Sequence, residues 1–293
     1  MKTEKSALVT GSTGGIGVEV SKLLAANGWN LIILNRSEAK AEKQINDLKE
    51  VFPERSYHSY ISDMMDLSDL GKVIEKIGTN HPKISALYNI AGILTDQRLE
   101  SAQGIEGHFA VNTVSSYLMI QGLRKQLGSG SSSNERSVVV NFSSSAIKSV
   151  KKLEIEKLTN PEDIGGLMGA YATSKLAITI VTDMLRDELF EEGILIYSAD
   201  PGPTKTSMTG SGDGMPWLIS FLRPILFKAP EAQAKKLVSA IDASVRENAS
   251  GRYISEGKRK STPAMVSDKE LQAELRSLLD SRIENFLPDR SNE

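Results

Sequence analysis

Cysteine is absent from this chain of 293 residues. The absence excludes disulfide bonds, thiol catalysis and thiolate metal sites, and it fits a reducing compartment. Histidine is scarce as well, since His58, His81 and His108 are scattered, without metal-ligand spacing and without a paired acid. We therefore expect neither a histidine-based metal site nor a Ser-His-Asp triad, and we predict that the protein binds no metal.

Neither sign of charge dominates, and no long hydrophobic run is present. The 35 basic and 37 acidic residues leave a formal net charge of −2, which provides no overall field to attract nucleic acid. No apolar stretch approaches the roughly 20 residues that cross a bilayer, and the polar residues 1–6 precede a strand too short for a signal sequence. We expect a soluble, cytoplasmic protein without a nucleic-acid partner.

Short apolar segments alternate with helical patterns along the whole chain. Alternation of this kind is typical of parallel βαβ units in a sheet that is covered on both faces. We predict one α/β domain over residues 1–293, built on a Rossmann-type, doubly wound parallel sheet of about seven strands. Such sheets bind ligands at the carboxyl ends of their strands. The predicted strands are 7–10, 31–34, 57–61, 86–90, 138–142, 194–199 and 252–254.

A glycine-rich turn joins the first predicted strand to a helix. Glycine permits a tight turn and a close approach to a pyrophosphate, and the helix adds unpaired N–H groups and the positive end of its dipole. The strand before the turn and the helix after it provide the context in which a glycine pattern indicates a dinucleotide site. We predict cofactor contacts at Gly11, Ser12, Thr13, Gly14, Gly15, Ile16 and Gly17.

A tyrosine and a lysine stand four residues apart, at Tyr171 and Lys175. On a helix these positions share a face, so the ammonium group can lie beside the phenol and lower its pKa from about 10. A tyrosine in that state can donate or accept a proton near neutral pH. Taken alone, such a pair is usually a half-buried ring beside a solvated charge, so the catalytic interpretation depends on the rest of the chain.

The order of these features resembles the classical branch of the short-chain dehydrogenase/reductase family, over nearly the whole chain. The glycine turn is similar to the family's cofactor turn. Asn89, Ala91 and Gly92 resemble its Asn-Asn-Ala-Gly stretch, in which Ile90 replaces the second asparagine. The other matching residues are Asn112 in a helix, Ser144 between Ser143 and Ser145, and Pro201 and Gly202 with Thr204 and Thr206 after them.

The resemblance implies hydride exchange between a nicotinamide cofactor and a small-molecule carbonyl or alcohol. Tyr171 would be the acid or base, and Ser144 would hydrogen-bond the reacting oxygen. Lys175 would hold the nicotinamide ribose and keep the tyrosine acidic. Asn112 would hold a water that connects Lys175 to solvent. The neighbouring Ser143 and Ser145 are expected to be turn residues.

The residues after the second and third predicted strands bear on the cofactor. Arg36 stands where NAD-dependent enzymes usually have an acid, and a guanidinium can bind the additional phosphate of NADP. We therefore predict NADP(H) in preference to NAD(H); a surface arginine is the alternative, because Gly14 is not the second basic residue that many NADP enzymes carry. Asp66 and Leu67 resemble the adenine-contacting pair, and Asp63 is the competing choice.

Three segments set the chain apart within the family. The insert 147–169, with a helical pattern at 153–158, and the C-terminal helix 268–286 resemble the retinol dehydrogenase and protochlorophyllide reductase-like subgroup. Segment 203–229 is long enough to be a substrate lid. Its apolar stretch, 208–227, favours a hydrophobic substrate. The alternatives are packing on the core or on a partner subunit, or a peripheral membrane contact.

Two other functions stay open at this point. Gly11, Gly14 and Gly17 also satisfy the turn pattern of the extended branch of the superfamily, whose members epimerise or dehydrate nucleotide sugars. A protein that binds NADPH and senses it without turnover would keep the same cofactor residues. Relatives often pair through the helices that carry Asn112 and Tyr171, so a homodimer or homotetramer is a further expectation.

Overall fold

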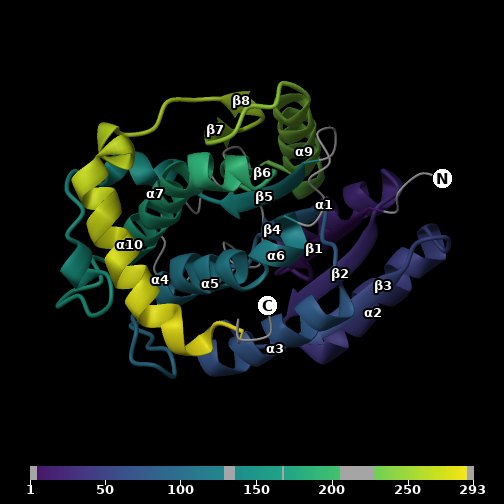
Figure 1. Cartoon of the computed structure of the whole chain (residues 1–293), viewed down its shortest axis with the longest axis horizontal. Coiled ribbons are helices and arrows are strands. Elements are labelled where there is room, and N and C mark those ends of the chain that lie inside the picture. The colour runs from purple at the N-terminus through teal and green to yellow at the C-terminus, as the bar shows by residue number, and fades with distance from the viewer. Residues whose placement is uncertain (1–4, 129–135, 167, 205–227, 289–293) are drawn as a thin grey trace.

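The chain folds around one central sheet of eight strands (Figure 1). The computed structural model describes residues 5–128, 136–166, 168–204 and 228–288. Each of the seven predicted strands is present to within one residue at either end, and a two-residue strand follows them. The strands are β1 Ser6–Thr10, β2 Asn30–Asn35, β3 Tyr57–Ile61, β4 Ala86–Asn89, β5 Ser137–Phe142, β6 Ile194–Asp200, β7 Arg252–Ser255 and β8 Lys258–Arg259.

The strand order is β3-β2-β1-β4-β5-β6-β7-β8. All neighbours from β3 to β7 are parallel, and only β8 pairs in the antiparallel sense. The predicted doubly wound, Rossmann-type sheet is therefore confirmed. The direction of winding reverses between β1 and β4, and at such a reversal the connections leave a crevice beyond the carboxyl ends of the strands.

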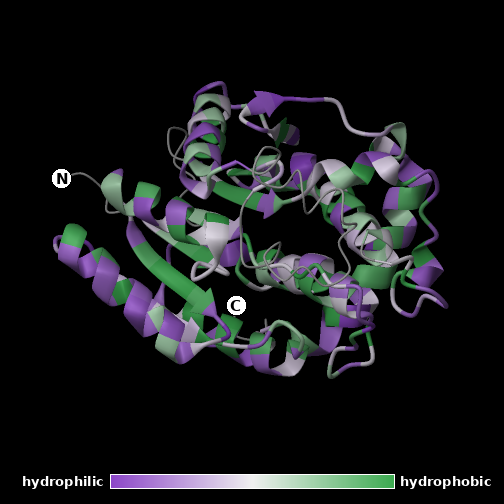
Figure 2. Ribbon diagram, turned by 180° about the vertical axis from the view of Figure 1, so that it is seen from behind, coloured by the Kyte–Doolittle hydropathy of each residue, from purple (hydrophilic) through white to green (hydrophobic). Residues whose placement is uncertain are grey.

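Two layers of helices cover the two faces of the sheet, because strand side chains alternate between them. Leu8 and Ile32 pack into one core layer, and Val9 and Ile33 into the other. Figure 2 shows the hydrophobic strands between helices of mixed character. One face carries α1 Gly15–Ala26, α2 Glu38–Val51 and α9 Pro230–Arg246; the other carries α3 Leu67–Asn80, α5 Ser115–Gly122, α7 Gly169–Glu191 and α10 Lys269–Ile283.

The shorter helical segments connect these layers. The insert 147–169 holds the end of η2 and one further 3-10 turn, η3, where the sequence pattern indicated a helix at 153–158. A turn this short buries none of its residues, so its apolar flanks, Leu153 and Leu158, supply the packing instead. The segments are α4 Gly107–Phe109, η1 Ala110–Val114, α6 Arg124–Gly128, η2 Ser145–Ser149, η3 Ile155–Lys157, η5 Ala264–Ser267 and η6 Glu284–Phe286.

Helix α10 crosses the outer side of α5 and α7 (Figure 1). The Tyr117 hydroxyl on α5 donates to Asp280 on α10 at 2.6 Å, and Gln272 on α10 donates to Asp183 on α7 at 2.8 Å. The helices that often pair between subunits of related proteins are thus covered by the chain's own C-terminal helix. Pairing through that face would require α10 to move away.

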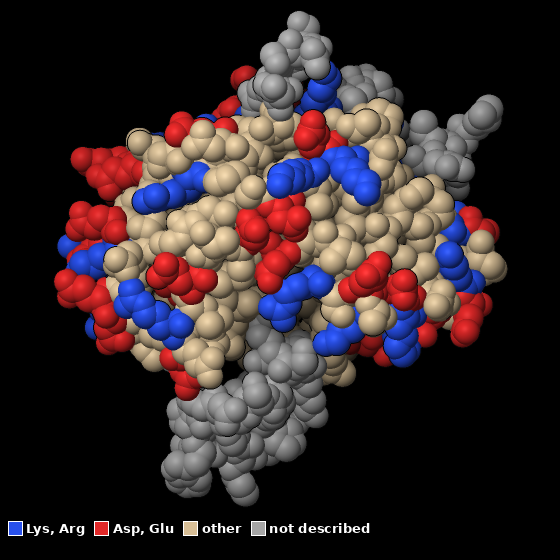
Figure 3. All heavy atoms as spheres, turned by 90° about the horizontal axis from the view of Figure 1, so that it is seen from below, with Lys and Arg blue, Asp and Glu red and all other residues tan. Residues whose placement is uncertain are grey.

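Several sequence predictions fall outside the described residues. They are Thr206, the stretch 208–227 and most of the proposed lid 203–229. Within the parts of the chain that are described, no helix is long and apolar enough to cross a membrane. On the face drawn in Figure 3, basic and acidic side chains are interspersed.

Candidate active site

The glycine turn follows β1 in a conformation that demands glycine at particular positions. Gly11 has a φ of +65°, and a Cβ there would lie 2.8 Å from the Cα of Ala91. A Cβ at Gly17 would lie 2.3 Å from the carbonyl oxygen of Gly11. At Gly14 a Cβ would meet nothing within 4 Å. Packing therefore requires Gly11 and Gly17 but not Gly14, which favours the turn pattern of the classical branch over that of the extended branch.

Two side chains from neighbouring elements brace this turn. Asn35, at the end of β2, donates to the Ser12 hydroxyl at 2.9 Å and accepts from the Thr13 amide at 3.2 Å. Gln44 on α2 accepts from that hydroxyl at 2.6 Å and donates to the Ser12 carbonyl at 2.8 Å. The Ser12 side chain is fully buried. It stabilises the turn from below, so only the backbone of Ser12 is left to face a ligand.

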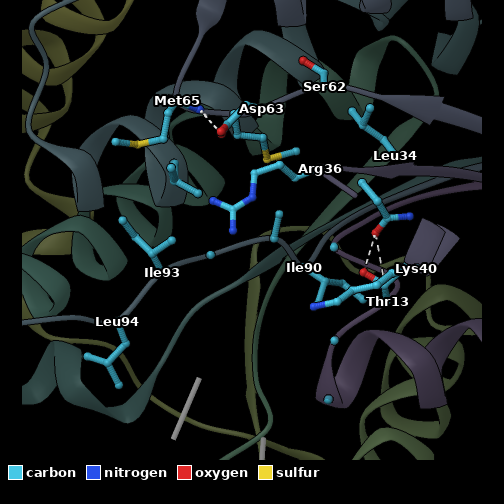
Figure 4. Close-up of a pocket in the computed structure, with 18 of the residues that line it drawn as sticks. Thr13, Leu34, Arg36, Lys40, Ser62, Asp63, Met65, Ile90, Ile93 and Leu94 are labelled. Atoms are coloured by element: carbon cyan, nitrogen blue, oxygen red, sulfur yellow. Dashed lines mark hydrogen bonds between the residues drawn. The ribbon is translucent and has the colours of Figure 1, made fainter. Parts of the chain in front are cut away.

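A cavity of about 490 Å³ opens above the turn, between β1, β2 and β4. Arg36 reaches into it from the end of β2, and Lys40 lines it from α2 on the side of Thr13 (Figure 4). Both side chains are exposed, and neither forms an ion pair within the described residues. Lys40 is the second cation that the sequence analysis had missed at the turn. Its spacing of four residues from Arg36 was the available signal.

The segment after β3 contributes Asp63 to the same cavity, together with Met64 and Met65. Asp66 instead caps α3, where its carboxylate accepts from the Ser68 amide at 3.0 Å. Leu67 is fully buried in the core. The geometry thus favours Asp63 over Asp66 and Leu67 as the residue that would contact the adenine. Asp66 and Leu67 already belong to the start of α3.

The segment after β4 connects the cavity to the helices. Ala91 and Gly92 line the cavity, whereas Asn89 points into the sheet and donates to Asn141 on β5 at 2.9 Å. A Cβ on Gly92 would lie 2.8 Å from Oδ1 of Asn112 and 3.2 Å from Nζ of Lys175. Glycine therefore lets the cavity wall contact both of these predicted site residues.

Asn112 lies in a π-helical stretch, η1. Short π-helical stretches of this kind are frequent at functional sites. Its side chain accepts from the Ile93 amide at 2.9 Å and donates to the Ile93 carbonyl at 3.2 Å and to Ser174 at 3.0 Å. The amide group thus holds the Ile93 backbone in place beside Gly92. Its hydrogen bonds give Asn112 a positioning role that the sequence analysis did not anticipate.

Ser144, Tyr171 and Lys175 come together at the carboxyl end of β5. Ser144 caps η2, and its hydroxyl lies near enough to Tyr171 to lower the pKa of the phenol. Ser143 turns into the core and bonds Thr179 at 2.7 Å, while Ser145 is exposed. Of the three serines, Ser144 is therefore the one whose side chain acts on the phenol.

A family model described as short chain dehydrogenase matches residues 5–154, about half of the chain. The chain belongs to this family. Human polyprenol dehydrogenase is 26% identical over 280 residues, which cover 94% of this chain and 83% of that protein. Human retinol dehydrogenase 13 is 26% identical over 277 residues, which cover 92% and 82%. With these relatives the chain falls in the retinol dehydrogenase-like subgroup, as predicted.

The solved structures support the same fold. The active-site complex of RhlG with NADP from Pseudomonas aeruginosa has a TM-score of 0.69 at 22% identity, and the match covers 86% of this chain and 94% of that one. Solved structures that match this fold include complexes with NADP and with NADH. The protein is thus a short-chain oxidoreductase by family.

The electrostatics of the short-chain dehydrogenase site differ from the sequence expectation in one respect. Burial raises the pKa of Tyr171; the hydrogen bond with Ser144 lowers it, and the negative charge of Asp200 raises it further. Lys175 does not offset this effect, because its Nζ donates to the Phe142 carbonyl at 2.8 Å and lies 5.9 Å from the centre of the phenol ring. The structure does not bear out the expected lowering of the Tyr171 pKa by Lys175, because burial raises that pKa.

Burial also acts on Lys175, which is 5% exposed. It lowers the pKa of the ammonium group to about 8, although Asp200 acts in the opposite direction. Asp200 ends β6 and is 2% exposed. The sequence analysis did not single it out, although it stands directly before the predicted turn at Pro201.

Asp200 holds that turn together. It accepts from the Gly202 amide at 2.8 Å, from the Ser255 hydroxyl at 2.8 Å and from the Tyr253 hydroxyl at 3.3 Å. Gly202 has a φ of +74°, and the Thr204 hydroxyl donates to its carbonyl at 2.8 Å. One buried carboxylate thereby connects the end of β6 to β7 beneath the predicted catalytic pair.

His108 corrects another sequence statement. The histidines were described as lacking a paired acid, but Nδ1 of His108 lies 2.7 Å from Oε1 of Glu106. Both side chains are buried, and the His108 ring lies beside Tyr171. The pair escaped notice because a spacing of two residues brings side chains together only when the local backbone bends.

Proposed function

We propose that this protein is an NADP(H)-dependent oxidoreductase that transfers hydride between the nicotinamide and a carbonyl or alcohol group of a hydrophobic small molecule. One observation carries the proposal. A single cavity wall runs from the glycine turn and two exposed cations to Gly92, where an added Cβ would meet both Asn112 and Lys175. This continuity supports the assignment of Asn112 and Lys175 to the same site as the glycine turn.

The residues around the cavity fit a dinucleotide phosphate. The close approach of Gly11 to Ala91 and of Gly17 to Gly11 leaves the backbone of the turn bare on the cavity side. Arg36 and Lys40 offer a bidentate guanidinium and a second positive charge to an additional phosphate. Asp63 would accept a hydrogen bond from the base. Similar folds have been solved with NADP and with NADH, so they do not distinguish the two cofactors. The preference for NADP therefore rests on Arg36 and Lys40.

When bound, the nicotinamide cofactor supplies or accepts the hydride. Tyr171, protonated because burial raises its pKa, would donate its phenolic proton to the carbonyl oxygen. The Ser144 hydroxyl would hydrogen-bond the same oxygen and orient it. Lys175 would bind the ribose of the cofactor, and its charge would stabilise the phenolate that remains. In the opposite direction the same phenolate would be the base.

The walls near the catalytic residues favour an apolar substrate. Ile93, Leu94 and Leu99 line the cavity on the side that leads toward Tyr171. Leu99 is 37% exposed, so its side chain is available to an apolar ligand at this wall. We infer that a lipophilic aldehyde, ketone or alcohol is the reacting molecule.

The experiment is a titration of the purified protein with NADPH and with NADH, followed by nicotinamide fluorescence. A panel of lipophilic aldehydes and ketones is then added while the absorbance of the reduced cofactor is recorded. We expect tighter binding of NADPH and its oxidation by some members of the panel. Binding without oxidation would favour a sensor of the cofactor over an enzyme, and no binding of either nucleotide would contradict the proposal.

A further inference from the structure

A buried acid and histidine lie beside the catalytic tyrosine. Glu106 is 4% exposed and His108 is not exposed at all, and the two side chains meet at 2.7 Å. Neither belongs to the residues that the hydride transfer proposed above uses. Burying a carboxylate is costly unless it is fully hydrogen-bonded, so a pair in this position calls for an explanation.

The hydrogen bonds define the state of the pair. The Thr95 amide donates to Nε2 of His108 at 3.2 Å, so Nε2 is an acceptor. The proton therefore lies on Nδ1 and is donated to Oε1 of Glu106. The other carboxylate oxygen of Glu106 accepts from the Phe109 amide at 2.9 Å. Every polar atom of the imidazole is thus used, and the ring cannot rotate without losing two hydrogen bonds.

The charge of Glu106 is maintained by these contacts. Burial tends to raise the pKa of its carboxyl group, but the hydrogen bond from the His108 ring and those from the His108 and Phe109 amides outweigh it and hold the pKa below its usual value. An ionised carboxylate binds Nδ1–H more strongly than a neutral acid would. Glu106 thereby orients the ring, in the way a carboxylate orients a metal-bound or catalytic histidine.

The oriented His108 ring contacts the candidate site on two sides. Thr95, held through its amide, lines the cavity on the same wall as Ile93 and Leu94. The Tyr171 ring packs against the His108 ring in an edge-to-face arrangement, with the centroids 6.5 Å apart and the planes at 77°. A simple helix cap at Glu106 would explain its bond to Phe109 but not these two contacts.

We propose that Glu106 and His108 are positioning residues of the active site, which hold the Thr95 backbone at the cavity wall and limit the movement of the Tyr171 ring. The proposal rests on the proposed function for its catalytic consequence. Its structural part, the bracing of Thr95, does not depend on turnover. A displacement of the phenol by about 1 Å would lower the reaction rate on the order of 10²-fold. A pair that limits this displacement therefore affects catalysis.

The experiment compares His108→Leu, His108→Gln and Glu106→Gln with the parent protein. His58→Gln is the matched control, since His58 is exposed on β3 and away from the site. We expect His108→Leu to lower kcat by roughly 10- to 100-fold while the Kd for NADPH changes less than about twofold. The glutamine at position 108 can still accept from the Thr95 amide, so it should recover part of the lost kcat.

The rate of hydrogen exchange at the Thr95 amide is a measurement that does not depend on turnover. We expect the exchange to be faster in folded His108→Leu than in the parent and unchanged in His58→Gln. Unchanged exchange would overturn the proposal, even if the parent protein oxidised no NADPH. Faster exchange with an unaltered kcat would overturn the catalytic part. Loss of NADPH binding in step with kcat would also contradict it, because a general loss of structure would then be the cause.

Discussion

The two ends of the candidate site are built in opposite ways. At the glycine turn, the chemistry is carried by bare backbone and by exposed cations, Arg36 and Lys40. At the far end, Lys175, Asp200 and Glu106 are charged or titratable groups with 5% exposure or less. The first end can be altered by surface substitutions at little cost in stability. At the second end, polar and charged groups lie in the core. A substitution there changes the pKa values of neighbouring groups and the free energy of unfolding.

The difference follows from what each end has to do. A phosphate keeps its charge and some of its water, so exposed cations can bind it. A proton transfer needs a phenol whose pKa and position are controlled, and burial achieves both. The variants below separate the two ends, beginning with the largest expected effect.

Tyr171→Phe tests the buried end. We expect kcat to fall by about 10²- to 10⁴-fold, because the general acid is removed, while the Kd for NADPH stays nearly constant. Stopped-flow oxidation of NADPH and fluorescence titration measure the two quantities. Tyr57→Phe is a control, since that hydroxyl bonds the Phe52 carbonyl at 3.0 Å at the far edge of the sheet. Retained turnover in Tyr171→Phe would remove the assignment of this residue as the acid.

Arg36→Asp tests the exposed end. We expect the Kd for NADPH to rise by roughly 10- to 100-fold and the Kd for NADH to change little, since only NADPH carries the additional phosphate. Lys40→Ala should show a smaller effect in the same sense. Lys43→Ala is the control, because Lys43 on the same helix pairs with Asp47. Equal weakening of both cofactors by Arg36→Asp would contradict the case for NADP, and a large loss of thermal stability would erase the contrast between the two ends.

Asp200→Asn alters the electrostatics beneath the catalytic pair. The charge of Asp200 raises the pKa of both Tyr171 and Lys175, so its removal should lower both. We expect the alkaline limb of the pH profile of kcat to move by about one unit toward lower pH. Asp242→Asn, a partly buried acid on α9, serves as the comparison. A profile that moves toward higher pH would show the opposite coupling.

Lys175→Met examines the cost of the buried ammonium group. Its pKa is lowered from the ordinary value of 10.5 to about 8 by burial. Between these values the unfolded chain binds more protons than the folded one, so the parent protein should gain stability as the pH rises from about 8 to 10.5. Below pH 8 the cost is fully present. We expect the methionine variant to be more stable at pH 7 by about 1–3 kcal/mol, although kcat is lost.

Chemical denaturation of the parent and of Lys175→Met at several pH values measures this difference. Lys22→Met is the surface control. If the hydrogen bond from Lys175 to the Phe142 carbonyl outweighs the cost of burial, the variant will be less stable at every pH. In that case the burial of the ammonium group would not destabilise the folded protein.

Much of the site could be predicted because its signals are local. The glycine turn and the pair at Tyr171 and Lys175 show spacings within a few residues of one another, and the choice of Ser144 rests on the resemblance of its strand end to the family's. The adenine-contacting acid was less accessible, since Asp63 and Asp66 both follow β3. Only the start of α3 at Leu67 separates them, because that start uses Asp66 as its cap.

The sequence by itself determined the sheet, its parallel winding and the family, because strand patterns and glycine requirements are properties of short segments. The tertiary structure decided how the site is charged. It placed Lys40 at the cavity near Thr13 and Asp200 under Tyr171, joined His108 to Thr95 and laid α10 over α5 and α7. These outcomes depend on burial and on contacts between distant segments, and for that reason the pKa of Tyr171 rises where local spacing alone predicted a fall.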